Sequence, residues 1–370
     1  MSQHSMSSKG PSRFEGGLME NVARAFPDAV RLLTTPPPAV SEAQAASVAK
    51  EIYGVVASAR LLAGERDRNF MLWAADGWRG VLKFYNSADD AATRDFQHGA
   101  LLHIERSGHH SDVPRLVKTL AGEHEFRVRV GGASQVGIMI SCIPGRGAGE
   151  FSSTPMLRRS IGRATAELAV ALADYDHACA RRVLLWDSMQ VGHLRGFADS
   201  MPPSERTAWL SGFLDRFADG VHDAARALPQ QVIHNDLSTC NVLVHNDRPG
   251  TVSGIIDFGD MAHAPTVNDL AITASYFMTG RGDPADELAD FLEGYETARP
   301  LGEAEIALIP ELIQARLATR VLLYQWRAML FPENRAYILR NSEGAWRLVD
   351  RLRDIPPTDL LRSINARRRT

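Results

Sequence analysis

The chain has 370 residues, of which 45% are hydrophobic and 23% are charged, with a formal net charge of −3. This composition is ordinary for a globular protein of two lobes or domains, and the slightly acidic balance argues against broad nucleic-acid binding. No apolar run is long enough to span a membrane, and the three cysteines lack the spacing of a zinc site or a disulfide framework. We therefore expect a cytoplasmic monomer or homodimer that binds neither nucleic acid nor membrane.

The first part of the chain predicts a small β-rich lobe over residues 18–142. Residues 1–17 are rich in serine and glycine and are expected to be disordered. Helical periodicity follows over 18–33, and Ser41 with Gln44 forms a candidate capping box for a helix that ends near Tyr53. Apolar and alternating patterns then predict five strands and one helix. The strands are expected at 55–62, 69–74, 78–85, 125–130 and 136–142, and the helix at 91–105.

A glycine-rich stretch at 143–149 is expected to be the hinge between this lobe and a larger helical lobe over 150–370. Helical patterns dominate the larger lobe, at 154–176, 203–228, 267–278, 284–296, 303–331 and 334–352. The basic ending at 367–369 is interpreted as a solvated tail. The predicted fold class is therefore α+β, with a small antiparallel β-rich N-lobe followed by a mainly helical C-lobe.

Two short segments carry most of the chemical information. Residues 234–241 read His-x-Asp-x-x-x-x-Asn, and residues 257–259 read Asp-Phe-Gly. In this order, with a short apolar hairpin between them, they resemble the catalytic loop and the metal loop of protein-kinase-like phosphotransferases. Asp236 then has the place of the base that orients the attacking hydroxyl. Asn241 and Asp257 offer the hard oxygen ligands that Mg²⁺ prefers, and His234 is expected to brace the loop.

The nucleotide half of such a site requires a lysine on the third strand. Lys83 lies there in an otherwise apolar run, where a charge is costly unless a phosphate or a carboxylate pairs with it. The loop between the first two strands contains Gly64, Arg68 and Asn69, and its backbone amides are candidates for binding phosphates.

The partner of that lysine is expected on the helix at 91–105. The position where protein kinases place a glutamate falls on Gln97, with Asp95 as the alternative.

From about residue 30 to residue 350 the chain resembles the aminoglycoside phosphotransferase and choline kinase superfamily. The segments at 64–70 and 256–261 look most like the hydroxylysine kinase branch, which is also found fused to class III aminotransferases. The resemblance implies a protein-kinase-like bilobal fold, Mg²⁺ with ATP (or GTP), and transfer of phosphate to a hydroxyl of a small molecule. It also implies that Asp269, in an Asp-Leu-Ala segment, anchors its helix to the catalytic loop.

Two departures from protein kinases favour a small substrate over a peptide. Asn235 replaces the arginine that couples the catalytic loop to a phosphorylated activation segment, and no long segment follows Asp257. Asp260 could bind a cationic substrate or a second metal ion. Arg316 and Arg320, at i and i+4 on one helix, could receive a substrate carboxylate, but we favour surface ion pairs for them.

We therefore expect a kinase for the hydroxyl of an amino acid or amino alcohol, of the hydroxylysine or homoserine kind. One alternative is an aminoglycoside antibiotic phosphotransferase, which would require an acidic C-lobe cleft for a polycation. The other alternative is a catalytically inactive nucleotide-binding protein. The presence of Asp236, Asn241, Asp257 and Lys83 argues against it.

Overall fold

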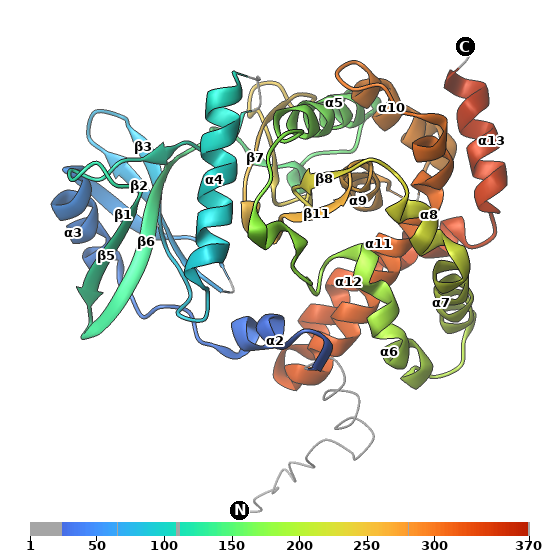
Figure 1. Cartoon of the computed structure of the whole chain (residues 1–370), viewed down its shortest axis with the longest axis horizontal. Helices are drawn as coiled ribbons and strands as arrows, with labels where there is room; N and C mark the ends of the chain where they lie inside the picture. Colours follow the sequence, from blue (N-terminus) through green and yellow to red (C-terminus); the bar gives the residue numbers. More distant parts are fainter. Residues whose placement is uncertain (1–23, 65, 109–111, 280, 369–370) are drawn as a thin grey trace, which may run out of the picture.

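A six-stranded antiparallel sheet forms the smaller of two lobes (Figure 1). The computed structural model describes residues 24–64, 66–108, 112–279 and 281–368, so the segment 1–17 predicted to be disordered lies outside the described residues. The strand order is β1-β2-β3-β6-β4, and β5 also pairs with β6. The strands span Ala57–Leu61 (β1), Arg68–Ala74 (β2), Arg79–Phe84 (β3), Leu116–Val117 (β4), Glu125–Val130 (β5) and Ala133–Ser141 (β6). The five predicted strands are confirmed with small shifts at their ends, and the short β4 was missed.

The N-lobe core forms because alternate residues of β2 and β3 point to the same face of the sheet. Phe70 and Leu72 of β2 and Leu82 and Phe84 of β3 are completely buried. Helix α3 (Glu42–Tyr53) packs its own apolar residues into this core. It starts at the predicted capping box, in which Ser41 and Gln44 bond each other's backbone N–H groups.

Helix α4 (Ala91–Ser107) stands between the sheet and the helical lobe (Figure 1). Phe96, Ala100 and Ile104 of this helix belong to the larger hydrophobic core, together with residues of the C-lobe. The Tyr175 hydroxyl also donates a hydrogen bond of 2.7 Å to the Phe96 carbonyl. The two lobes are therefore joined by packing along α4 as well as by the covalent connection.

The predicted hinge at 143–149 is not an irregular linker. Residues Arg146–Gly147 form β7, which pairs with β9 (Val242–Val244) of the C-lobe, and a short 3-10 turn follows at Ala148–Glu150. The glycines in this segment allow neighbouring atoms to approach the backbone closely. A Cβ atom on Gly145 would lie 2.4 Å from the Ser253 hydroxyl oxygen and 2.8 Å from the Val244 carbonyl oxygen.

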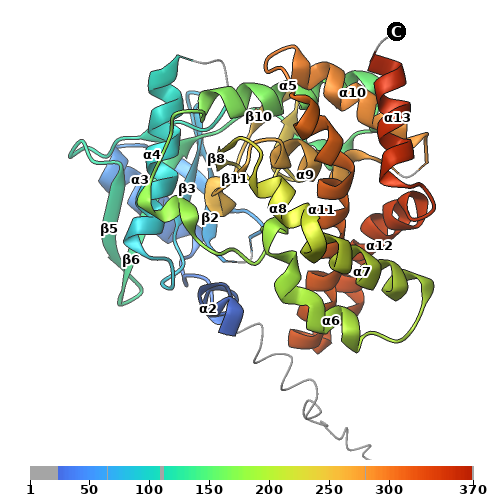
Figure 2. The same cartoon turned by 45° about the vertical axis from the view of Figure 1, so that its right-hand side comes forward.

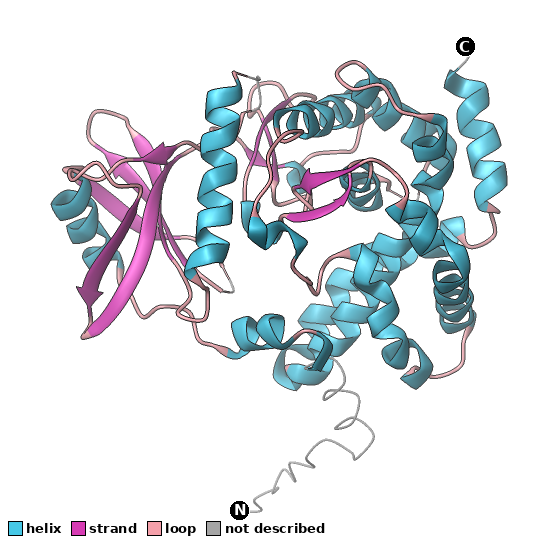
Figure 3. Cartoon of the chain, viewed as in Figure 1, coloured by secondary structure: helices cyan, strands magenta, loops and turns pink. Residues whose placement is uncertain are grey.

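Helices make up most of the C-lobe, as Figure 3 shows, and strands are confined to a three-stranded and a two-stranded sheet. The main helices are α5 (Pro155–Ala171), α7 (Glu205–Arg216), α9 (Asn268–Phe277), α10 (Pro284–Glu296), α11 (Glu303–Leu330) and α12 (Arg335–Leu352). The short helices are α2 (Pro27–Thr34), α6 (Arg195–Ser200) and α8 (His222–Arg226). The helices predicted for this lobe are confirmed, except that the one at 203–228 is split at 217–221 into α7 and α8. Of the helix predicted at 18–33, residues 18–23 lie outside the described residues, and α2 accounts for its second half. No helix in the described ranges is long and apolar enough to cross a membrane.

The interpretation of the basic end of the chain as a solvated tail is only partly right, because Arg368 is exposed but neither Arg367 nor Arg368 is part of a free tail. Both lie in α13 (Pro357–Arg368), which packs alongside α10 (Figures 1 and 2). Arg367 pairs with Asp283 at 3.0 Å, and Arg368 pairs with Glu296. The buried Leu360 and Ile364 hold the helix in place, and this amphipathic pattern was too short to stand out in the sequence.

Candidate active site

The hairpin of β9 and β10 (Val252–Ile255) brings the two sequence motifs together. The strands pair antiparallel, with Ile255 opposite Val242. Beyond that pair, the Ile256 N–H donates to the Asn241 carbonyl at 2.9 Å. Asn241 and Asp257 are therefore held at the same end of the hairpin, although 16 positions separate them in the sequence.

Asp269 fixes the start of the catalytic loop. Its carboxylate is buried and accepts backbone N–H bonds from His234 at 2.8 Å and from Asn235 at 2.7 Å. Asn235 adopts a left-handed backbone conformation with φ of 65°, which asparagine tolerates better than most residues. The anchoring role implied by the family resemblance agrees with these contacts.

His234 braces the loop from inside. Its Nε2 lies 3.1 Å from the Ile256 carbonyl, and its Nδ1 lies 3.3 Å from the Asp236 backbone nitrogen. Because a carbonyl can only accept and an N–H can only donate, these contacts require the neutral tautomer with its proton on Nε2. Burial also lowers the pKa of His234, which keeps the ring neutral. The imidazole thus ties the catalytic loop to the strand that leads into Asp257.

Asp236 is held by two side chains, one on each carboxylate oxygen. The Asn241 amide nitrogen donates to Oδ2 at 2.8 Å, and the Arg316 guanidinium donates to Oδ1 at 2.7 Å. Burial raises the pKa of Asp236 to about 6; Arg316 opposes this shift, and the charges of Asp260 and Asp257 add to it. A carboxylate with a pKa close to neutral can accept a proton from a hydroxyl and later release it.

The interpretation of Arg316 and Arg320 as surface arginines is wrong. Helix α11 runs through the middle of the C-lobe, so both of its faces are buried, and Arg316 has no exposed surface while Arg320 is 6% exposed. Besides Asp236, Arg316 bonds the Trp186 carbonyl and the Tyr276 hydroxyl. The i and i+4 spacing places the two arginines on one face of the helix, but it does not show whether that face meets solvent or the core.

Asn241 and Asp257 have the donor atoms of a site for a hard divalent cation. The Asn241 amide nitrogen is occupied by Asp236, which leaves its amide oxygen as the atom available to a ligand. Asp257 is exposed and has a φ of 68°, and its carboxylate accepts from the Gly259 N–H at 3.4 Å. A non-glycine residue held in this conformation is uncommon and is often found at functional sites.

Asp260 lies close to guanidinium groups, and it is also near enough to Asp236 for the two carboxylate charges to interact. Arg66 from the loop between β1 and β2 reaches its Oδ1 at 3.5 Å, which links the N-lobe to the metal-loop segment. Arg182 donates to the neighbouring Gly259 carbonyl at 2.6 Å. Although burial alone would raise the pKa of Asp260, Arg66 and Arg182 lower it, so the carboxylate stays ionised.

Lys83 has a different partner from either of the predicted ones. Its ammonium pairs with the Asp67 carboxylate at 2.8 Å, and Asp67 also accepts from the Asn86 N–H at 2.8 Å. Asp95 is largely exposed, and its carboxylate lies 3.3 Å from His177, while Gln97 is buried in α4. The acid that pairs with this lysine therefore does not come from α4, where protein kinases place a glutamate. It comes from the loop between β1 and β2.

The loop residues singled out from the sequence have mixed placements. Asn69 pairs with Lys83 in the β2–β3 ladder, and Gly64 lies close to the Asn69 amide. Arg68 donates through Nε to the Pro38 carbonyl at 2.9 Å, so this donor ties the N-terminal segment to the sheet. Arg66, which directs its charge to Asp260, is the better-placed cation of this loop.

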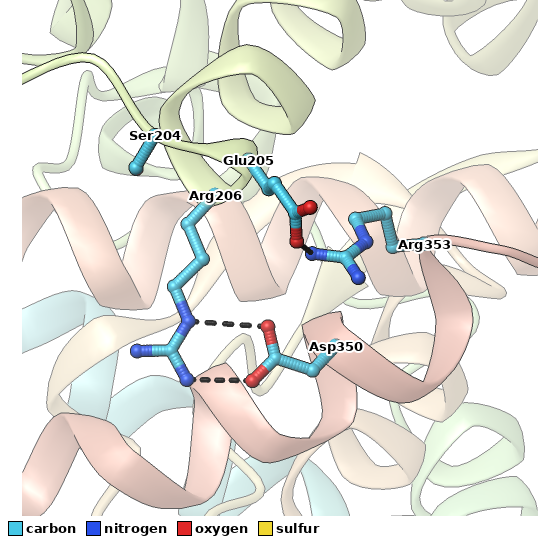
Figure 4. Close-up of a pocket in the computed structure, with 5 residues that line it drawn as sticks. All are labelled: Ser204, Glu205, Arg206, Asp350 and Arg353. Carbon is cyan, nitrogen blue, oxygen red and sulfur yellow. Dashed lines mark hydrogen bonds and ion pairs between the residues drawn. The ribbon is translucent and has the colours of Figure 1, made fainter.

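A surface hollow of about 500 Å³ lies apart from these residues, between α7 and α12 (Figure 4). Arg206 and Asp350 form two parallel hydrogen bonds across it, and Arg353 pairs with Glu205 at 2.8 Å. Its charged groups are thus satisfied by one another, and Ser204 caps the start of α7. Because the titratable groups with convergent contacts lie around Asp236, we assign the candidate site there and not in the hollow.

Comparison with known proteins agrees with the geometry. The sequence profile of the phosphotransferase enzyme family matches residues 58–305, about two thirds of the chain. The chain belongs to this family. The phosphotransferase is 26% identical to hydroxylysine kinase from Danio rerio over 326 residues, which cover 85% of the chain and 92% of that relative. It is also 29% identical to homoserine kinase from Polaromonas naphthalenivorans over 222 residues, covering 56% and 65% of the two chains.

Solved structures support the fold of this phosphotransferase. A microcompartment-associated aminopropanol kinase superposes with a TM-score of 0.63 at 20% identity, covering 85% of this chain and 98% of that one. The match confirms the predicted protein-kinase-like bilobal arrangement. The family assignment and the similarity to hydroxylysine kinase indicate a phosphotransferase that acts on an alcohol group.

Proposed function

We propose that this protein transfers the terminal phosphate of a Mg²⁺–nucleoside triphosphate to the hydroxyl of an amino acid or amino alcohol. The observation that carries the proposal is the arrangement around Asp236, in which Asn241 and Arg316 each bind one carboxylate oxygen and burial raises the pKa toward neutrality. The full-length similarity to hydroxylysine kinase supports the substrate class.

In this reaction Asp236 orients the substrate hydroxyl and takes its proton as the hydroxyl oxygen forms a bond to the terminal phosphorus. The bond from that phosphorus to the bridging oxygen breaks, and the nucleoside diphosphate leaves. Asn241 and Asp257 would hold Mg²⁺, which neutralises the charge of the phosphates when bound. Lys83 and Arg66 supply positive charge on the N-lobe side. In the structure Lys83 pairs with Asp67, and Arg66 pairs with Asp260.

An aminoglycoside is a less suitable acceptor for this site. It is a polycation, whereas the buried Arg316 pairs with Asp236 and a second buried arginine, Arg320, follows one helical turn later on α11. Positive charge at this position favours a substrate that brings negative charge of its own.

The proposal is tested by a coupled assay of nucleoside diphosphate release with Mg²⁺ and either ATP or GTP, across hydroxy amino acids, amino alcohols and aminoglycosides. Asp236→Asn is expected to lower kcat by about 10²- to 10⁴-fold, the range found for loss of a general base, while nucleotide binding persists. Asp215→Asn, which changes an exposed aspartate paired with Arg195, is the matched control and should retain full activity. Turnover of no substrate above the Asp236→Asn background would contradict the proposal, and turnover of aminoglycosides alone would contradict its substrate class.

A further inference from the structure

Arg320 differs from the other deeply buried arginines in the described part of the chain. Three of these arginines have a carboxylate partner: Arg94 pairs with Glu125 at 2.8 Å, Arg158 with Asp290 at 2.7 Å, and Arg316 with Asp236 at 2.7 Å. Arg320 is 6% exposed, and within the described residues no carboxylate forms an ion pair with it. A buried charge without a counter-charge is costly, and arginine is rarely buried unless it is paired.

The contacts of Arg320 satisfy only part of its guanidinium. Its Nη1 donates to the Ser275 carbonyl at 2.7 Å, and its central carbon lies 3.9 Å from the centre of the Tyr276 ring. Its Nε is buried and has no hydrogen-bond partner. A guanidinium has five N–H donors, so this one retains donor capacity for an anion.

The position of Arg320 connects it to the catalytic base. It lies one helical turn beyond Arg316 on α11, and both guanidinium groups lie against the ring of Tyr276. Arg316 also donates to the Tyr276 hydroxyl at 3.2 Å and to Asp236 at 2.7 Å. Adjacent turns of a helix are about 5.4 Å apart, so a short carbon chain could connect a hydroxyl at Asp236 with an acidic group at Arg320.

Three half-buried aromatic side chains lie next to Arg316 and Arg320. Trp186 and Tyr324 have their ring centres 6.0 Å apart, and Arg316 lies 5.9 Å from the Trp186 ring. Tyr276 is likewise half-buried. Apolar walls with one unsatisfied cation are typical of a small-molecule subsite, in which few polar groups set the orientation.

We propose that Arg320, seated on Tyr276, binds the carboxylate of the substrate, so that the enzyme selects hydroxy amino acids over amino alcohols. This inference rests on the proposed function, because it concerns the acceptor of the same reaction. Arg320 acts as a specificity residue, while Arg316 remains occupied by Asp236. The carboxylate supplies the counter-charge that Arg320 lacks and accepts its N–H groups.

The test compares substrates that differ only by the carboxylate. Homoserine and 3-aminopropanol form one such pair, and 5-hydroxylysine with its decarboxylated diamine forms another. We expect wild-type kcat/KM to favour the acid member of each pair by at least about 10-fold. Arg320→Met should reduce this preference by about 10- to 100-fold, the range for one charge-assisted hydrogen bond, and Arg320→Lys should restore part of it.

Arg216→Met is the matched control. Arg216 lies on α7 and contacts the helix that carries Arg320: it bonds Gln314 at 2.9 Å and pairs with Glu311 at 3.5 Å, both on α11. Its loss therefore perturbs α11 without removing Arg320. Its acid-to-alcohol preference should equal that of wild type. If Arg320→Met fails to fold, Arg320→Lys decides, and an unchanged preference in that variant overturns the inference.

The outcomes separate this inference from the proposed function. Wild-type turnover of amino alcohols without preference for the acid would overturn the carboxylate subsite and leave the kinase activity standing. An equal loss for both members in Arg320→Met would show a purely structural role and would also overturn the subsite. No wild-type turnover of either member of any pair would overturn both.

Discussion

The Asp269→Asn substitution tests whether one buried carboxylate positions the catalytic loop. Asp269 accepts the N–H groups of His234 and Asn235 at 2.8 and 2.7 Å, each a charge-assisted hydrogen bond worth about 1.5–3 kcal/mol. Asparagine has nearly the same shape but only one acceptor oxygen. Its amide nitrogen would face the second N–H, which leaves one buried donor unpaired.

The expected loss of stability is about 2–5 kcal/mol, the sum of one weakened bond and one buried donor without a partner. This is a large share of the 5–15 kcal/mol that typically separates folded and unfolded states. The loop that carries Asp236 should also shift. A displacement of about 1 Å of a catalytic group can reduce kcat by about 10²-fold. Urea unfolding monitored by circular dichroism gives the first quantity, and nucleoside diphosphate release at saturating substrate gives the second.

Thr273→Val is the matched control for Asp269→Asn. The Thr273 hydroxyl is buried in the same helix α9 and donates to the Asp269 carbonyl at 2.7 Å. Valine keeps the shape and removes this one neutral bond, which should cost about 1 kcal/mol and leave kcat near the wild-type value. If Asp269→Asn is no less stable than Thr273→Val and retains full kcat, the anchoring role of the carboxylate is refuted.

Two further predictions concern pH and the end of the chain. Burial, helped by the charges of Arg94 and Lys83, lowers the pKa of His98 to about 4. Below pH 6.5 the unfolded chain therefore binds more protons than the folded chain does. The stability contributed by the neutral ring is therefore present above pH 6.5 and lost as the pH falls toward 4, by about 2 kcal/mol at pH 5. His98→Gln should show a smaller loss of unfolding free energy between pH 7 and pH 5, and an unchanged loss would contradict the assignment. Deleting residues 356–370 removes the buried Leu360 and Ile364 and should lower the unfolding free energy by several kcal/mol, whereas Arg368→Ala should cost less than about 1 kcal/mol. An equal drop in Tm for the deletion and Arg368→Ala would show that the ion pair, and not the apolar contact, holds α13.

The features that were predictable from the sequence are those encoded over short distances. The alternating apolar residues of β2 and β3 determine the face that packs on α3, and the Ser41 capping box marks the start of that helix. The two motifs meet because a hairpin of only a few residues per strand connects them. Local patterns of this kind require no knowledge of the remaining chain.

The features that were missed depend on contacts between distant parts of the chain. Arg316 reads like a surface arginine, because no local pattern shows that α11 is enclosed by the other helices. The acid that pairs with Lys83 was sought in a helix by analogy with protein kinases, yet Asp67 reaches it from the neighbouring loop. One signal was available, since Asp67 directly precedes the strand that pairs with β3. Pairing of Asn69 with Lys83 in an antiparallel ladder places residues of this loop near the lysine.

The charges around the site provide a physical reason for assigning different roles to its aspartates. Arg66 and Arg182 lower the pKa of Asp260, so this carboxylate remains ionised and suits a constant electrostatic task. Arg316 and, more weakly, Arg66 only partly offset the burial of Asp236 and the charges of the neighbouring carboxylates, and its pKa is raised to about 6. Two acids whose environments move their pKa values apart can serve as a fixed charge and as a proton acceptor in one centre. Arg316 on α11 therefore contributes to the chemistry, together with Arg66, by limiting how far burial and the neighbouring carboxylates raise the pKa of the base.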